Sequence, residues 1–204
     1  MKSLAFLILL GIFIMSCTEN EFTEPPHKER NEVVSLLHES PFLENYYLIS
    51  TYTSLLNGNT DQEYTESEKE YFGKFVEEKV NRNLKALSEA YPNLVDLLKG
   101  LNPEECMMGV EIFNDWFAEN KNTLLTNTPF TKLERDDRLM ESMYVICGGR
   151  CLTPNTNASA AACLFGCTNS NNICVASGGD PVLCQTIANQ CSKDCCSSFC
   201  PIKE

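Results

Sequence analysis

The sequence of 204 residues contains few histidines and few basic side chains, and both shortages limit what the protein can bind. His27 and His38 are the only histidines, and no metal-type spacing links them. The 16 lysines and arginines are outnumbered by 28 acidic residues and form no basic cluster. Nucleic-acid binding requires clustered basic side chains that contact phosphates, so we expect no nucleic-acid partner.

Signatures of common catalytic sites are also missing. The sequence has no G-x-S-x-G, no H-E-x-x-H, no phosphate-binding G-x-x-x-x-G-K and no calcium-binding loop. None of its cysteine pairs has the C-x-x-C spacing of thioredoxin-like redox sites. These absences favour a non-enzymatic protein, and we assign no catalytic residue, no metal ligand and no cofactor.

Strand-like alternation is nowhere sustained between residues 30 and 146, where apolar residues instead recur at helical spacing. The clearest helix follows Thr65 and Glu68, which have the spacing of a capping box. Its apolar stripe comprises Phe72, Val76, Val80, Leu84 and Leu87. We predict an all-α fold, with an acidic helical domain over residues 31–146. A disulfide-stapled helical region, residues 147–204, follows it and is packed on it or continuous with it.

Capping residues mark further helices. Ser40 is the expected N-cap of a helix that stops at Asn57 and Gly58. Asn102 is expected to cap the helix that carries Phe113, Trp116 and Phe117, and helical spacing predicts that these aromatic residues belong to the core. Asp180, followed by a proline at the first helical position, is expected to cap the last helix.

The N-terminus has the pattern of a targeting segment. Lys2 precedes the apolar run Leu4–Met15, whose 12 residues are too few to span a bilayer and fit a signal-peptide core. The run ends in IMSC, residues 14–17, which resembles the lipobox of bacterial lipoprotein precursors. The resemblance implies that residues 1–16 are removed and that Cys17 is lipidated. Thr18 is not the aspartate that retains many lipoproteins at the inner membrane, so the resemblance favours anchoring at the outer membrane, facing the periplasm or the surface.

Residues 17–30 are polar and acidic and contain Pro25 and Pro26. Such a composition cannot bury a core, so this segment is expected to be a lipidated tether.

Cysteines are concentrated near the C-terminus. Exported chains meet an oxidising compartment, where thiols become disulfides, and this favours covalent staples over a thiolate site for copper or zinc. The disulfide candidates are Cys147, Cys151, Cys163, Cys167, Cys174, Cys184, Cys191, Cys195, Cys196 and Cys200. Cys106 stands apart from them on an apolar helix and, because the mature chain has an odd number of cysteines, it is the expected free thiol.

Several of these cysteines recur at C-x-x-x-C spacing, which places both side chains on one helix face. Residues 147–167 resemble the twin C-x-x-x-C hairpin of the small mitochondrial intermembrane-space chaperones. The resemblance implies that Cys147 bonds Cys167 and that Cys151 bonds Cys163.

Five cysteines on one final helix could not readily bond one another, because they lie on two separate lines along it. Either the helix breaks near Cys195 and Cys196, or some of the hairpin cysteines bond the last helix instead. Spacing alone leaves both alternatives open.

The leading hypothesis is therefore a lipoprotein of the outer membrane or cell surface that serves as a non-enzymatic interaction or structural module. Its expected partners are the membrane, through the lipid anchor, and an unidentified protein or ligand. One alternative is a thiol-rich copper- or zinc-binding protein. Another is a carrier or enzyme with an apolar pocket between its helices, which a cavity with converging polar groups would favour.

Overall fold

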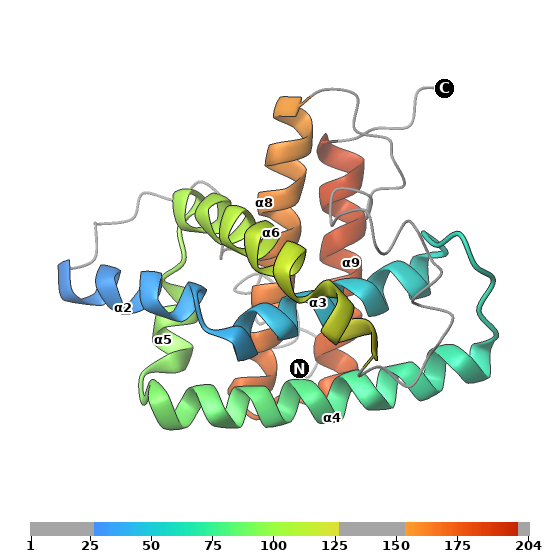
Figure 1. Ribbon diagram of the computed structural model, residues 1–204, viewed down its shortest axis with the longest axis horizontal. Helices are drawn as coiled ribbons and strands as arrows, with labels where there is room; N and C mark the ends of the chain where they lie inside the picture. The colour runs from blue at the N-terminus through green and yellow to red at the C-terminus, as the bar shows by residue number, and fades with distance from the viewer. Residues whose placement is uncertain (1–26, 127–153, 200–204) are drawn as a thin grey trace, which may run out of the picture.

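The computed structural model describes residues 27–126 and 154–199. Within these two ranges the chain forms α-helices and no strand, which confirms the all-α prediction (Figure 1). The helices are α2 (His27–Leu37), α3 (Ser40–Asn57), α4 (Glu66–Ala90), α5 (Leu94–Lys99), α6 (Pro103–Thr126), α8 (Pro154–Ala176) and α9 (Pro181–Phe199). Helix α2 thus begins within the segment 17–30 that was predicted to be a tether.

None of the described helices is long and apolar enough to cross a membrane.

The predicted capping box begins α4. The backbone N–H of Glu68 donates to Thr65 Oγ1 over 3.2 Å, and the backbone N–H of Thr65 donates to Glu68 Oε2 over 2.8 Å. These reciprocal bonds satisfy two backbone donors that the first helical turn leaves without partners. The five apolar residues of the predicted stripe are all buried, so the helix faces the core along one side.

Helix α6 begins with a similar pair. Asn102 Oδ1 accepts from the backbone N–H of Glu105, and Glu105 Oε2 accepts from the backbone N–H of Asn102. The expected cap at Asn102 is confirmed.

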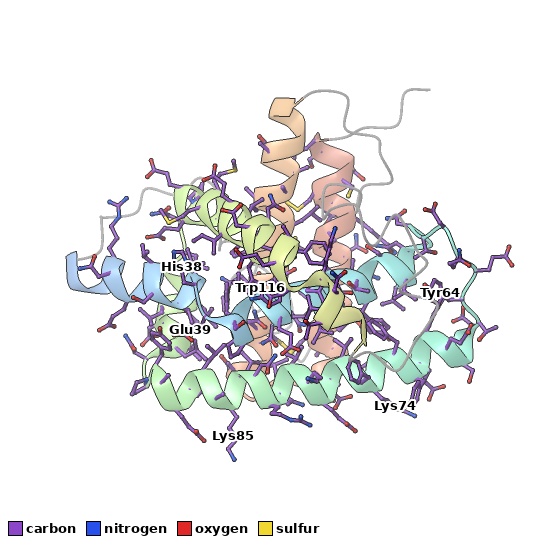
Figure 2. The ribbon with its side chains drawn as sticks, in the orientation of Figure 1. His38, Glu39, Tyr64, Lys74, Lys85 and Trp116 are labelled. Carbon is purple, nitrogen blue, oxygen red and sulfur yellow. A yellow bond between two sulfur atoms is a disulfide. The ribbon has the colours of Figure 1, made fainter. Side chains whose placement is uncertain are left out.

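Helix α3 departs from the sequence expectation at its start. Glu39, not Ser40, is its N-cap residue, and the Ser40 hydroxyl instead accepts a hydrogen bond of 2.9 Å from the indole N–H of Trp116 on α6 (Figure 2). The expected stop is confirmed, because Gly58 ends the helix in the left-handed conformation, with φ at 67°.

Helix α8 packs into the core formed by the preceding helices. Phe165 on α8 is 1 % exposed, and its ring lies 4.6 Å from that of Tyr46 and 5.8 Å from that of Phe42, both on α3. A Cβ at Gly109 of α6 would collide with the Phe165 ring, so glycine there lets α6 cross α8 closely. Helix α8 of the cysteine-rich segment therefore shares one apolar core with the described helices of the acidic segment.

Candidate functional site

A tight turn reverses the chain between α8 and α9. Gly178 adopts the left-handed conformation, with φ at 81°, and the backbone N–H of Gly179 donates to the carbonyl of Cys174. Asp180 then caps α9, as predicted, by accepting from the backbone N–H of Leu183 over 2.9 Å. The two helices consequently lie side by side and antiparallel, as the orange and red ribbons of Figure 1 show.

Three disulfides join α8 to α9. Cys163 bonds Cys195, Cys167 bonds Cys191 and Cys174 bonds Cys184, with Cα–Cα distances of 5.9, 5.6 and 5.6 Å. Spacings of four and seven residues keep each set of three on one helix face, so an antiparallel partner can meet all of them. The prediction that these six cysteines form disulfides is confirmed.

The pairing differs from the one that the mitochondrial hairpin implied. Cys163 and Cys167 bond the last helix, not Cys151 and Cys147, because α8 continues to Ala176 and presents this face to α9. The alternative that hairpin cysteines bond the last helix is therefore the right one. Helix α9 also runs unbroken past Cys195 and Cys196 to Phe199.

Cys106 is disulfide-bonded, so the prediction that it is the free thiol is wrong. Cys106 is fully buried in the apolar core, at the first turn of α6. The prediction relied on its distance in sequence from the other cysteines, and that distance does not show which sulfur lies near it in the folded chain. Cys196 is disulfide-bonded as well, and no described cysteine is free. The predicted sites Cys17, Cys147, Cys151 and Cys200 lie outside the described residues.

Sulfur atoms gather where the first two disulfides lie next to each other. Cys167 Sγ is 3.3 Å from Cys195 Sγ, and the Sγ atoms of Cys163, Cys167 and Cys195 lie within 4.8 Å of one another. Among the described residues this is the one cluster with metal-ligand chemistry. Each of the three sulfurs is bound in a disulfide, and a disulfide offers no thiolate to a metal.

A groove of about 460 Å³ lies between α4 and α9, over a floor formed by α3 and α8. Its apolar lining includes Val76 and Val80 of α4, Val175 of α8 and Val182 of α9. Val182 is 68 % exposed, and Leu56, an exposed residue near the end of α3, also lines the groove. A volume of this size falls within the range of roughly 300–1,000 Å³ that small-molecule sites occupy.

Carboxamide side chains provide the polar part of this groove. Asn171, Gln185 and Asn189 line it from α8 and α9, and Asn81 lines it from α4. Gln185 Nε2 donates to Thr53 Oγ1 over 3.1 Å, so its Oε1 is left to accept from Asn171 Nδ2 over 3.3 Å. These two hydrogen bonds fix the orientation of the Gln185 and Asn171 amide groups. They leave the Oδ1 of Asn171 without a hydrogen-bond partner in the described structure, and the Oδ1 of Asn189 has none either.

The charged rim of the groove is negative. Glu70, Lys74 and Glu77 line it from α4, and Lys74 Nζ lies 2.9 Å from Glu70 Oε1, which leaves one acidic charge in excess. Burial, followed by the negative charges of Glu70 and Glu66, raises the pKa of the Tyr52 phenol in the groove. The electrostatic environment therefore disfavours an additional negative charge.

Sequence reasoning missed the polar layer that supports the groove. Residues 168–172, TNSNN, lie in the middle of α8 and are all buried. Asn172 Oδ1 accepts from Asn45 Nδ2, whose own Oδ1 accepts from Asn83 Nδ2, and Asn169 Nδ2 donates to the Leu98 carbonyl over 2.7 Å. Five consecutive polar residues directly after Cys167 were the available signal, but in sequence alone they are typical of an exposed loop.

His38 belongs to no group of potential metal ligands among the described residues. His38 is exposed at the junction of α2 and α3, and His27 is the first residue of α2.

Comparison of the chain with protein-family models, with curated proteins and with solved structures gave no match.

Proposed function

We propose that the protein is an exported bacterial lipoprotein, anchored to the outer membrane through a lipid on Cys17, and that its helical body is a non-enzymatic binding module. The lipobox-like residues 14–17 support the anchor. Disulfides between α8 and α9 are typical of an exported chain and support the oxidising compartment.

The groove between α4 and α9 is the observation that carries the binding role. It combines an apolar lining with carboxamides whose orientation is fixed, which is the composition expected of a binding site. The disulfides hold α9 against α8, so one wall and part of the floor are covalently joined. The same groove supports the related role of a carrier for a small apolar ligand. A copper- or zinc-binding role has less support, because every described cysteine is disulfide-bonded.

The anchor is tested with Cys17→Ser in the full-length chain expressed in a bacterium. We expect the native protein to fractionate with the outer membrane and to show the added mass of two or more acyl chains, since one chain alone binds a membrane only marginally. Cys17→Ser should lack that mass and leave the membrane fraction. The control Thr18→Ser should behave as the native protein does. A Cys17→Ser variant that stays in the outer membrane would contradict the anchor.

The groove is tested with the neutral apolar dye Nile red and a pair of matched variants. Thr186 lines the groove from the exposed side of α9, whereas Gln190, one turn further along, does not line it. We expect Thr186→Trp to fill the groove and weaken dye binding at least tenfold, and Gln190→Trp to leave it within twofold. Fluorescence titration measures both affinities. Equal binding by the two variants would place the dye elsewhere and remove the support for this site.

A further inference from the structure

Two of the disulfides between α8 and α9 are in contact with each other. One joins Cys163 to Cys195, and the other joins Cys167 to Cys191. Cys167 Sγ lies 3.3 Å from Cys195 Sγ, although these two sulfurs belong to different disulfides. None of the four cysteines lines the groove between α4 and α9, so their chemistry is independent of the proposed binding role.

The four cysteines differ in their exposure to solvent. Cys167 is 1 % exposed and Cys195 is 3 % exposed, and both belong to a small apolar cluster. Cys163 and Cys191 are only partly buried. Each disulfide therefore joins one partly exposed cysteine to one enclosed cysteine, and the two enclosed cysteines are those whose sulfurs meet.

This contact allows an incoming thiol to displace a thiol of the protein. A disulfide breaks when a thiolate bonds to one of its sulfurs, and the other sulfur leaves as a thiolate. An external thiolate that bonds to Cys191 Sγ releases Cys167, whose freed side chain can rotate toward Cys195 Sγ, 3.3 Å away. Attack there forms a bond between Cys167 and Cys195 and breaks the bond to Cys163. The Cys163 sulfur leaves as a thiolate and takes a proton from water.

Entry at the other end produces the same new bond. An external thiolate that bonds to Cys163 releases Cys195, and attack by Cys195 on Cys167 then releases Cys191. Two disulfides exist before and after the exchange, one of them finally with the external thiol, so no oxidant or reductant is consumed. Burial favours the exchange, because a thiolate is disfavoured in apolar surroundings and moves from an enclosed sulfur to a partly exposed one.

We propose that the two contacting disulfides form a thiol-exchange site, which accepts a small thiol at Cys163 or Cys191 and releases the other of these two cysteines as a free thiol. Cys167 and Cys195 relay the exchange between them. Because both ends are partly buried, the site suits a small thiol, of the class of glutathione or free cysteine. Helices α8 and α9 stay covalently joined, since the new bond between Cys167 and Cys195 also connects them.

Reduced glutathione tests the exchange on the disulfide-bonded protein. The folded protein is treated with glutathione and alkylated with a maleimide, and the species that carries one glutathione and one alkyl group is mapped by mass spectrometry. Fragmentation of peptides cut after Phe165 and after Lys193 places each group on one cysteine. We expect the two groups on Cys163 and Cys191. Two groups on the partners of one original disulfide, or no glutathione adduct at all, would overturn the proposal.

Serine variants test the relay without an added thiol. Cys191→Ser leaves Cys167 without its partner, and exchange should then place at least about ten times more maleimide label on Cys163 than on Cys167. Cys184→Ser is the matched control, because its partner Cys174 lies outside the cluster of sulfurs. Its label should stay on Cys174. Label that remains on Cys167 in the first variant, or that spreads from Cys174 in the control, would contradict a relay through the two contacting disulfides.

Discussion

Replacing Phe165 with alanine should lower the free energy of unfolding by about 3–5 kcal/mol, the usual cost of truncating a fully buried aromatic residue. Phe165 is almost completely buried, and its ring contacts aromatic rings of α3 and the backbone of α6 at Gly109. The cavity cannot close easily, because α8 is held on its other side by disulfides to α9. Urea denaturation, followed by helical circular dichroism, measures the loss.

Leu183→Ala is the control for this variant. Leu183 is 45 % exposed on α9, so its truncation should change stability by no more than about 0.5 kcal/mol. A loss of less than 1 kcal/mol for Phe165→Ala would contradict the placement of α8 in the common core.

Removing the two disulfides far from the turn, Cys163–Cys195 and Cys167–Cys191, should lower the free energy of unfolding by a similar amount. In the variant with alanine at Cys163, Cys167, Cys191 and Cys195, only the bond near the turn still joins the two helices. The first disulfide that closes such a loop stabilises the protein by roughly 3 kcal/mol, and the second contributes less because the two loops are nested. We therefore expect the free energy of unfolding to fall by about 3–5 kcal/mol. The cysteines also pack with Ala160 and Leu164, and this contact is lost too.

Hydrogen exchange locates the effect. Amides of residues 160–167 should exchange much faster in the four-alanine variant, whereas those of the α4 core stripe should change little. The comparison variant replaces Cys174 and Cys184, which close a shorter loop with a sequence separation of 10, and it should lose less stability. An unchanged stability of the four-alanine variant would show that the two disulfides far from the turn do not hold the helices together.

Local signals in the sequence predicted the helices well. The capping pair Thr65 and Glu68, the cap at Asn102 and the stop at Gly58 depend on neighbours a few residues away, and each forms as expected. The Ser40 cap failed because the helix begins one residue earlier, with Glu39 as its N-cap, and the Ser40 hydroxyl instead accepts from the distant Trp116 indole.

The site was much less predictable, because it depends on contacts between distant segments. Asn45 lies 127 residues from Asn172, and Gln185 lies 132 residues from Thr53, so no spacing rule connects them. Spacing did show that Cys163 and Cys167 share a helix face, but it could not show which helix faces them. Polar residues 168–172 are helical because several of their side chains find buried partners, which overrides their weak helix propensity.

The unequal spacing of the cysteines determines how α9 can align with α8. Both helices carry their cysteines at intervals of four and seven residues, so the three pairs match in one alignment only. Sliding α9 by one helical turn would bring a single pair into register, either Cys163 with Cys191 or Cys167 with Cys195. Formation of all three disulfides therefore selects one alignment of α8 and α9. This alignment fixes the position of α9, a wall of the groove, relative to α8, which forms part of its floor.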